Sequence, residues 1–170
     1  MPEKHRRYFL RDKEAKALLN KAPEKLRSTL DQVLKGKTSF EVVETDFAEI
    51  FLVNGKPLLF KSGDNVHPTL VFDEFFTVAP KAVVDMGAVP YVCKGANIMA
   101  PGIRRYEGDF RKGDTVYVVD EKHGKALAVG EALYDCEEAK GVKQSVVVRN
   151  VHFVSDKIWE FMKKSEEGAR

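Results

Sequence analysis

The sequence has few cysteines and lacks the motifs that mark common enzyme classes. Its two cysteines, Cys93 and Cys136, form no Cys-x-x-Cys pair, and its four histidines have no metal-ligand spacing. We therefore expect reduced core cysteines, a cytoplasmic location, and no metal ion or other cofactor. There is no P-loop, Rossmann fingerprint, His-Glu-x-x-His or Gly-x-Ser-x-Gly sequence. The sequence thus predicts a protein that is not an enzyme and has no catalytic residue.

Long hydrophobic runs are also missing. No apolar run is long enough to span a bilayer, so we expect no membrane partner. The basic N-terminus, residues 1–16, lacks the apolar core of a signal peptide. The composition is that of a globular protein, because 44% of the 170 residues are hydrophobic and 10% are aromatic. This length suits one domain or two small ones.

The net charge of +2 conceals a strong segregation of charge along the chain. Residues 1–37 carry 11 Lys or Arg against 5 Asp or Glu, whereas residues 38–76 carry 2 against 7. Residues 77–170 are nearly balanced, with 15 against 14. The basic segment indicates either a face for a polar partner or simply the solvated side of two helices.

The first part of the chain predicts an α+β domain over residues 1–76. Asp12 can cap one helix, and Pro23 fits the start of a second that ends at Gly36. The apolar period then changes to that of strands, over 39–44, 48–60 and 65–72. Between two of these runs, Asn54-Gly55 is the sequence of a type I′ hairpin turn.

The second part predicts a small closed β-barrel over residues 77–155. Short strands are expected at 82–85, 114–120, 126–135 and 145–154, separated by turns that contain glycine. A short helix is expected over 88–94, with Pro90 in its first turn and Gly95 at its end. Ser155 can cap a closing helix in the C-terminal segment 156–170.

One stretch of this barrel, KGANIMAPGI (Lys94–Ile103), combines bare backbone with positive charge. Gly95 and Gly102 permit either a tight bend or the close approach of a nucleic-acid backbone. Lys94, Arg104 and Arg105 could neutralise phosphates, and Asn97 could bind a base edge or a 2′-hydroxyl. The N-terminus of the predicted helix, near Gly87, would also favour an anion.

The stretch VVDMGAVPYVCKGANIMAPGI (Val83–Ile103), with the later strands, resembles a PUA domain, the module named after pseudouridine synthase and archaeosine transglycosylase. The resemblance implies a pseudo-barrel that binds structured RNA through residues 87–94, 95–103 and 151–154. It adds Ala96 and Met99 to the expected RNA-binding set of Gly87, Lys94, Gly95, Asn97, Gly102, Arg104 and Arg105.

Upstream, IFLVNGKPLLF (Ile50–Phe60) and HPTLVFDEF (His67–Phe75) resemble the pre-PUA domain of the malignant T-cell-amplified family. Members of that family act at the small ribosomal subunit in translation re-initiation and ribosome recycling, and archaea encode stand-alone proteins of this plan. The resemblance implies tRNA or rRNA as ligand, the small ribosomal subunit as a target, and a density-regulated-like protein with a SUI-type domain as a partner.

Three functions remain open on the sequence alone. The first is a non-enzymatic RNA-binding protein of the translation apparatus. The second is an accessory RNA-binding factor for tRNA or rRNA modification, since PUA domains are often attached to such enzymes. The third is a small metabolic enzyme with an unrecognised site, which would require a deep pocket lined by polar groups.

Overall fold

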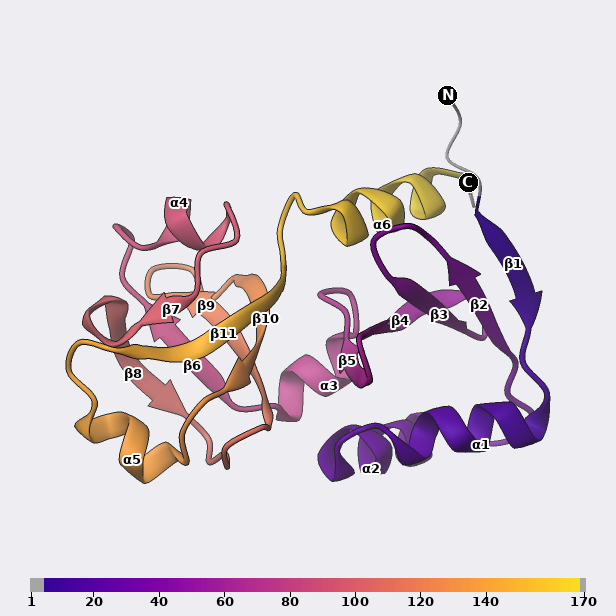
Figure 1. The fold of residues 1–170 in the computed structure, drawn as a ribbon, viewed down its shortest axis with the longest axis horizontal. Helices are drawn as coiled ribbons and strands as arrows, with labels where there is room; N and C mark the ends of the chain where they lie inside the picture. Colours follow the sequence, from indigo (N-terminus) through magenta and orange to yellow (C-terminus); the bar gives the residue numbers. More distant parts are fainter. Residues whose placement is uncertain (1–4, 169–170) are drawn as a thin grey trace. The chain divides into compact units, whose positions relative to one another are not determined.

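The structure, a computed structural model, describes residues 5–168 and divides into two compact units, with the division between Phe75 and Phe76. The first four residues of the expected N-terminal domain and the last two of the expected C-terminal tail lie outside the described range. Both units combine helices and strands, so the α+β class is confirmed (Figure 1). No helix in residues 5–168 is long and apolar enough to cross a membrane.

The first unit is built on a five-stranded antiparallel sheet in sequential order. Its strands are β1 (Arg6–Phe9), β2 (Phe40–Glu44), β3 (Glu49–Val53), β4 (Lys56–Ser62) and β5 (Asn65–Pro68). Asn54 and Gly55 both have positive φ, 50° and 85°, which confirms the predicted hairpin between β3 and β4. The sheet follows the predicted strands because their apolar runs are buried, with Ile50 and Phe60 paired across β3 and β4 and both fully buried.

Two helices, α1 (Asp12–Asn20) and α2 (Glu24–Val33), lie along one side of this sheet (Figure 1). Leu18, Leu26 and Leu30 form their buried face. The expected boundaries were close but not correct: Arg11 rather than Asp12 occupies the N-cap, and α2 ends at Val33, three residues before Gly36. Helix α3 (Asp73–Val78), at the junction of the units, was not predicted because its apolar run is short.

Strand β1 was also missed, because its sequence, Arg-Arg-Tyr-Phe, is dominated by charge. Pairing with β2 brings the Arg7 side chain 3.0 Å from Glu41 and lets the Tyr8 hydroxyl donate to Glu44 at 2.8 Å. This bond to Glu44 raises the pKa of Tyr8. Part of the basic N-terminal segment is therefore neutralised by the acidic segment that follows it in the chain.

The second unit contains a six-stranded sheet that curls into a pseudo-barrel. Its strands are β6 (Lys81–Val84), β7 (Ile98–Met99), β8 (Ile103–Glu107), β9 (Thr115–Asp120), β10 (Ala126–Ala132) and β11 (Val146–Phe153), in the order β7-β11-β10-β9-β6-β8. The two outer strands, β7 and β8, are joined by the single turn η1 (Ala100–Gly102), so the chain itself closes the sheet. Only the β6–β9 pair is parallel among the pairs of this sheet in the described residues.

The interior of the pseudo-barrel is filled by small and branched side chains. Val84, Val116, Val118 and Val148 are among its fully buried members, and Ile98 joins them from β7. A bulge in the β10–β11 ladder lies at Gly130, where a Cβ would overlap Val148 Cγ1 and lie 3.0 Å from the Arg149 carbonyl. Gly130 is thus required for the two strands to approach.

Two further helices belong to this unit, α5 (Cys136–Gly141) and α6 (Lys157–Gly168). Helix α5 lies between the strands expected at 126–135 and 145–154, and it was not predicted. The cap of α6 was assigned to the wrong residue: Asp156 Oδ1 accepts the Trp159 N–H at 2.8 Å. Ser155 has φ of 78°, outside the extended conformation that an N-cap adopts.

Asp120, at the end of β9, organises the turn to β10 and generates a pH-dependent prediction. Its buried carboxylate accepts backbone N–H groups of His123 at 2.5 Å and Lys125 at 3.1 Å. The bond from His123, above all, lowers the pKa of Asp120. A lowered pKa stabilises the fold at pH values above the unfolded pKa, and this stabilisation is lost as the pH falls through the folded pKa.

We expect Asp120→Asn to lower the free energy of unfolding by about 1 kcal/mol at pH 7, because charge-assisted bonds to the turn are weakened. The difference from wild type should shrink below about pH 4, where the unfolded aspartate protonates. Urea denaturation at pH 7 and pH 3 measures both quantities. A difference that stays constant with pH would contradict the assigned role of the carboxylate.

Candidate nucleic-acid interface

All nine predicted RNA-binding residues lie in one continuous segment of the second unit, residues 85–105. It comprises a turn after β6, the short helix α4 (Val89–Val92), a loop, β7, η1 and the start of β8. The Asp85 N–H donates to the Gly102 carbonyl at 2.9 Å, so the turn and η1 lie together although 17 residues separate them. Gly87 and Gly102 are thereby brought close in space.

The glycines of this segment are needed by the fold itself. Gly95 has φ of +97°, and a Cβ there would lie 3.0 Å from the Phe153 ring. A Cβ at Gly87 would lie 3.3 Å from Asp85 Oδ1, and one at Gly102 would lie 3.3 Å from Ala88 Cβ. Close packing within the protein therefore accounts for the bare backbone, whatever ligand this surface binds.

The expected anion site at the helix N-terminus is wrong. Helix α4 has only four residues, and the Asp85 carboxylate accepts the Ala88 N–H at 2.8 Å. Pro90 has no N–H to offer. A carboxylate thus already occupies the position at which an anion was expected, and it would repel a phosphate.

Asn150, which the sequence analysis did not select, holds the loop after α4 in place. Its side-chain N–H₂ donates to the carbonyls of Val92 at 3.1 Å and Ala96 at 3.0 Å, and its backbone N–H donates to Asn97 Oδ1 at 3.0 Å. More than fifty residues separate Asn150 from this loop, so no local pattern could have revealed the contact.

The predicted base-binding residue Asn97 is exposed, and one of its two polar groups is already used. Because Oδ1 accepts from Asn150, only the amide N–H₂ has no partner among residues 5–168. Asn97 can therefore donate to a ligand but is poorly placed to accept from one. Ala96 and Met99 are exposed beside it, and Met99 belongs to the outer strand β7.

The three predicted cations differ in their surroundings. Arg104 lies 3.0 Å from Glu121, and Arg105 lies 3.2 Å from Glu107, with 62% and 58% of their side chains exposed. Within the described chain Lys94 has no acidic partner, and it is exposed. Exposed ion pairs contribute little, about 0–1 kcal/mol, so both arginines remain able to exchange a carboxylate for a phosphate.

The remaining polar candidates of this unit have structural roles. His152 is fully buried on β11, with Nδ1 2.8 Å from Asp156 Oδ2, as expected of a satisfied core histidine. Both cysteines are free, and burial raises the pKa of the Cys93 thiol. No cluster of three His, Cys, Asp or Glu suited to a metal ion occurs among the described residues.

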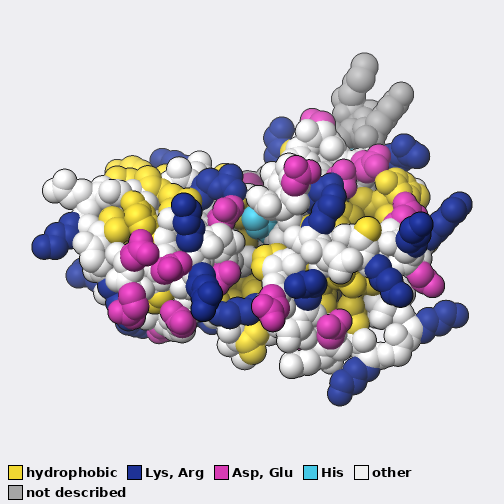
Figure 2. Space-filling view, turned by 60° about the horizontal axis from the view of Figure 1, so that its bottom comes forward, with side chains coloured by type: hydrophobic (Ala, Val, Ile, Leu, Met, Phe, Trp, Pro, Cys, Tyr) yellow, Lys and Arg dark blue, Asp and Glu magenta, His cyan; other side chains and the backbone are white. Residues whose placement is uncertain are grey.

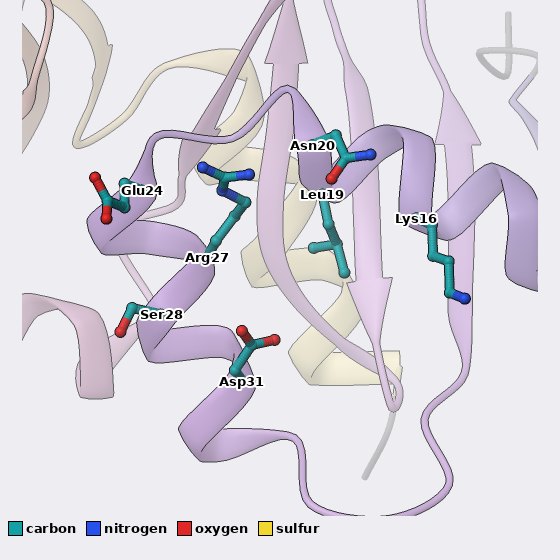
Figure 3. Close-up of a pocket in the computed structure, with 7 residues that line it drawn as sticks. All are labelled: Lys16, Leu19, Asn20, Glu24, Arg27, Ser28 and Asp31. Atoms are coloured by element: carbon teal, nitrogen blue, oxygen red, sulfur yellow. The ribbon is translucent and has the colours of Figure 1, made fainter.

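The basic N-terminal helices form a surface pocket of about 430 Å³ between α1 and α2 (Figure 3). Lys16 and Arg27 line it, but so do Glu24 and Asp31, with Leu19 between the helices. This pocket lacks the uniform positive charge that a phosphate-binding surface requires. The molecular face drawn in Figure 2 likewise carries Lys and Arg interspersed with Asp and Glu.

Comparison with known proteins places these features in a family. The PUA domain model matches residues 80–154, and a model described as a domain of unknown function (DUF1947) matches residues 6–72. An uncharacterized protein of Methanocaldococcus jannaschii is 38% identical over 94% of this chain and 98% of its own length. Malignant T-cell-amplified sequence 1 of Danio rerio is 30% identical over 76% of this chain and 75% of its own length.

The chain belongs to the malignant T-cell-amplified family. Another similar protein is translation machinery-associated protein 20 of Saccharomyces cerevisiae, 32% identical over 86% of this chain and 85% of its own. A hypothetical protein of Pyrococcus horikoshii has a similar structure, with a TM-score of 0.77 and 31% identity over 92% of this chain and 99% of that one. A PUA-domain structure from Aeropyrum pernix, a tartrate complex, has a TM-score of 0.74 and 27% identity over 94% and 92%. The resemblance detected in the sequence is thus confirmed, and so is the fold it implied.

The contact of Gly95 with Phe153 generates a prediction for the fold of this family member. We expect Gly95→Ala to lower the free energy of unfolding by about 2–4 kcal/mol, because it adds both left-handed strain and overlap with the ring. Gly113→Ala is the matched control: φ is +92° and no atom lies within 4 Å of its Cβ position. It should cost about 1 kcal/mol. Equal losses in urea denaturation would contradict the role of Phe153.

Asn150 generates a second prediction, which concerns the loop it holds. We expect Asn150→Ala to accelerate hydrogen exchange at the amides of residues 94–97 at least tenfold, since about 1–3 kcal/mol of anchoring hydrogen bonds is lost. Asn65→Ala, an exposed asparagine of β5, serves as control and should leave this loop unchanged. Unaltered exchange in the Asn150 variant would show that packing alone positions the loop.

Proposed function

We propose that this protein is a non-enzymatic RNA-binding protein of the translation apparatus that acts in the cytoplasm. It binds structured RNA, either tRNA or small-subunit rRNA, and serves translation initiation or ribosome recycling. The observation that carries the proposal is the family membership together with a PUA match over the unit that holds Lys94, Arg104 and Arg105. The printed name of the yeast relative, translation machinery-associated protein 20, supports the link to translation.

We further propose that residues 77–155 form the RNA-binding domain and residues 1–76 a separate domain that contacts a partner. RNA would contact Lys94–Asn97, Met99, Gly102 and Arg104–Arg105, whereas Asp85 disfavours a phosphate at Gly87. The two cations and two carboxylates of the α1–α2 pocket support a protein partner at the first domain over a second RNA contact. By family resemblance, the small ribosomal subunit and a density-regulated-like protein with a SUI-type domain are the candidates.

The absence of catalytic activity belongs to the same proposal. A nucleophile needs a base within hydrogen-bond reach, and the base needs a partner that orients it. His152 is fully buried, and its Nδ1 lies 2.8 Å from the Asp156 carboxylate. Asp156 also accepts the Trp159 N–H at the start of α6, so this pair has a structural role. Cys93, whose thiol pKa is raised by burial, lacks the character of an activated nucleophile.

The RNA surface is tested by replacing its three cations together. We expect the triple variant Lys94→Ala, Arg104→Ala, Arg105→Ala to bind structured RNA at least tenfold more weakly at low salt. The slope of log K against log salt should fall by roughly 0.7–0.9 for each phosphate that the variant no longer neutralises. The control is the triple variant Lys56→Ala, Lys61→Ala, Lys143→Ala, which removes the same charge elsewhere. Equal losses of affinity in both variants would place the interface elsewhere.

The link to translation is tested in cell extract. Native lysate is fractionated on a sucrose gradient at low and high salt, and the protein is followed by immunoblot. We expect it to sediment with small ribosomal subunits or with tRNA at low salt and to be released as the salt rises, as the phosphate contacts predict. A protein that remains at the top of the gradient at every salt concentration would contradict the proposed function.

A further inference from the structure

A second pocket of the PUA-matching unit lies between β8 and α5 and has a volume of about 320 Å³. Arg104, Arg105 and Tyr106 line it from β8, and Lys140 lines it from α5. Both elements occupy the lower side of the pseudo-barrel in Figure 1. Neither α5 nor Lys140 was part of the predicted RNA surface, which ended at Arg105.

The charge of this pocket distinguishes it from the pocket between α1 and α2. Three cations line it, and no Asp or Glu is found among the described residues that do so. Apart from Tyr106, the rest of the lining is apolar and includes Ala139 and Val142. A pocket with donors and no acidic side chain in its wall suits an anion that accepts several hydrogen bonds at once.

The carboxylates that pair with these cations lie outside the lining and can be displaced. Glu137 contacts Lys140 at 3.0 Å, as Glu121 and Glu107 contact the two arginines, and all three basic side chains are more than half exposed. Such exposed pairs contribute about 0–1 kcal/mol each. The hydrogen bond from Lys140 to Glu137 raises the pKa of the lysine, so the ammonium stays charged at neutral pH.

Tyr106 can add a neutral donor to the three cations. Burial raises the pKa of Tyr106 to about 12, so at neutral pH its hydroxyl keeps the proton and a phenolate does not form. The ring packs edge-on against Phe110, with centroids 5.5 Å apart, which fixes its position against the core. A protonated hydroxyl can donate to an anionic oxygen, whereas a phenolate would repel it.

We propose that the β8–α5 pocket holds one phosphate group of the bound RNA, with Lys140, Arg104 and Arg105 as its cationic contacts and Tyr106 as a neutral one. This inference rests on the proposed RNA-binding function. An arginine guanidinium suits the oxygens of a phosphate, because it offers paired donors in a planar fork. The RNA path then continues from Lys94 and Asn97 along β8 to α5, using the two arginines in common.

The test compares two lysines of the same short segment in the full-length protein. Lys140→Gln removes the cation that lines the pocket, and Lys143→Gln removes an exposed cation that does not. Fluorescently labelled unfractionated tRNA and small-subunit rRNA are the probes, and anisotropy gives Kd across a range of KCl concentrations. We expect Lys140→Gln to weaken binding of the better probe about three- to tenfold and to reduce the salt slope by roughly 0.7–0.9. Lys143→Gln should match wild type.

Two further variants separate a phosphate contact from a general change of charge. Glu137→Gln releases Lys140 from its carboxylate and should tighten binding about two- to threefold. Tyr106→Phe keeps the ring and removes the donor, so it should weaken binding without altering the salt slope. Thermal unfolding of each variant confirms that the fold is intact, as expected for exposed side chains at positions 137 and 140.

The outcomes distinguish the pocket from the function on which it rests. If wild type binds neither RNA, both the proposed function and the pocket assignment fail. If wild type binds RNA and Lys94→Ala weakens it, but Lys140→Gln behaves like Lys143→Gln, the function stands and the pocket assignment is overturned. The pocket assignment is also overturned if Lys140→Gln lowers affinity with an unchanged salt slope, because a cation that neutralises a phosphate must contribute to that slope.

Discussion

The candidate interface depends on contacts made by strand β11, the last strand of the chain. From this strand Asn150 donates to the carbonyls of Val92 and Ala96, and Phe153 packs where Gly95 has no side chain. The same strand pairs with β10 on one side and β7 on the other, so it connects the candidate surface to the buried core. Without these contacts the glycines of this loop would allow many backbone conformations, and its polar groups would have no fixed position.

Several arginines of this protein are paired with glutamates from another strand or from their own. The arginines of β1 meet the glutamates of β2, and the arginines of β8 meet Glu121 and Glu107. A single stretch of basic sequence thus says little about the surface potential. The composition of each pocket says more: carboxylates enter the wall of the α1–α2 pocket, whereas the β8–α5 pocket is lined by cations and apolar groups. This difference separates a surface suited to a protein from one suited to phosphate.

Much of the fold could be predicted from local sequence. The hairpin at Asn54-Gly55, the strands around Ile50 and Val118, and the short helix with Pro90 in its first turn all follow from turn chemistry and apolar period. The errors occur where tertiary pairing overrides local preference. Strand β1 is held by glutamates of β2, and helix α5 by the burial of Cys136 and Ala139. The glutamates that pair with β1, and the core residues against which α5 packs, lie outside these two segments.

The sequence by itself determined the α+β class, the family and the group of residues that form the candidate surface, because glycine turns, apolar runs and motif order are local properties. Only the tertiary structure decided what those residues do there. In the folded chain Gly95 packs against Phe153, and the side-chain carbonyl of Asn97 accepts a hydrogen bond from Asn150. Asp85 lies where an anion was expected, and Lys140 lines the same pocket as the arginines of β8. These are contacts between residues far apart in the chain or side chains whose direction depends on the folded backbone, and no local pattern encodes them.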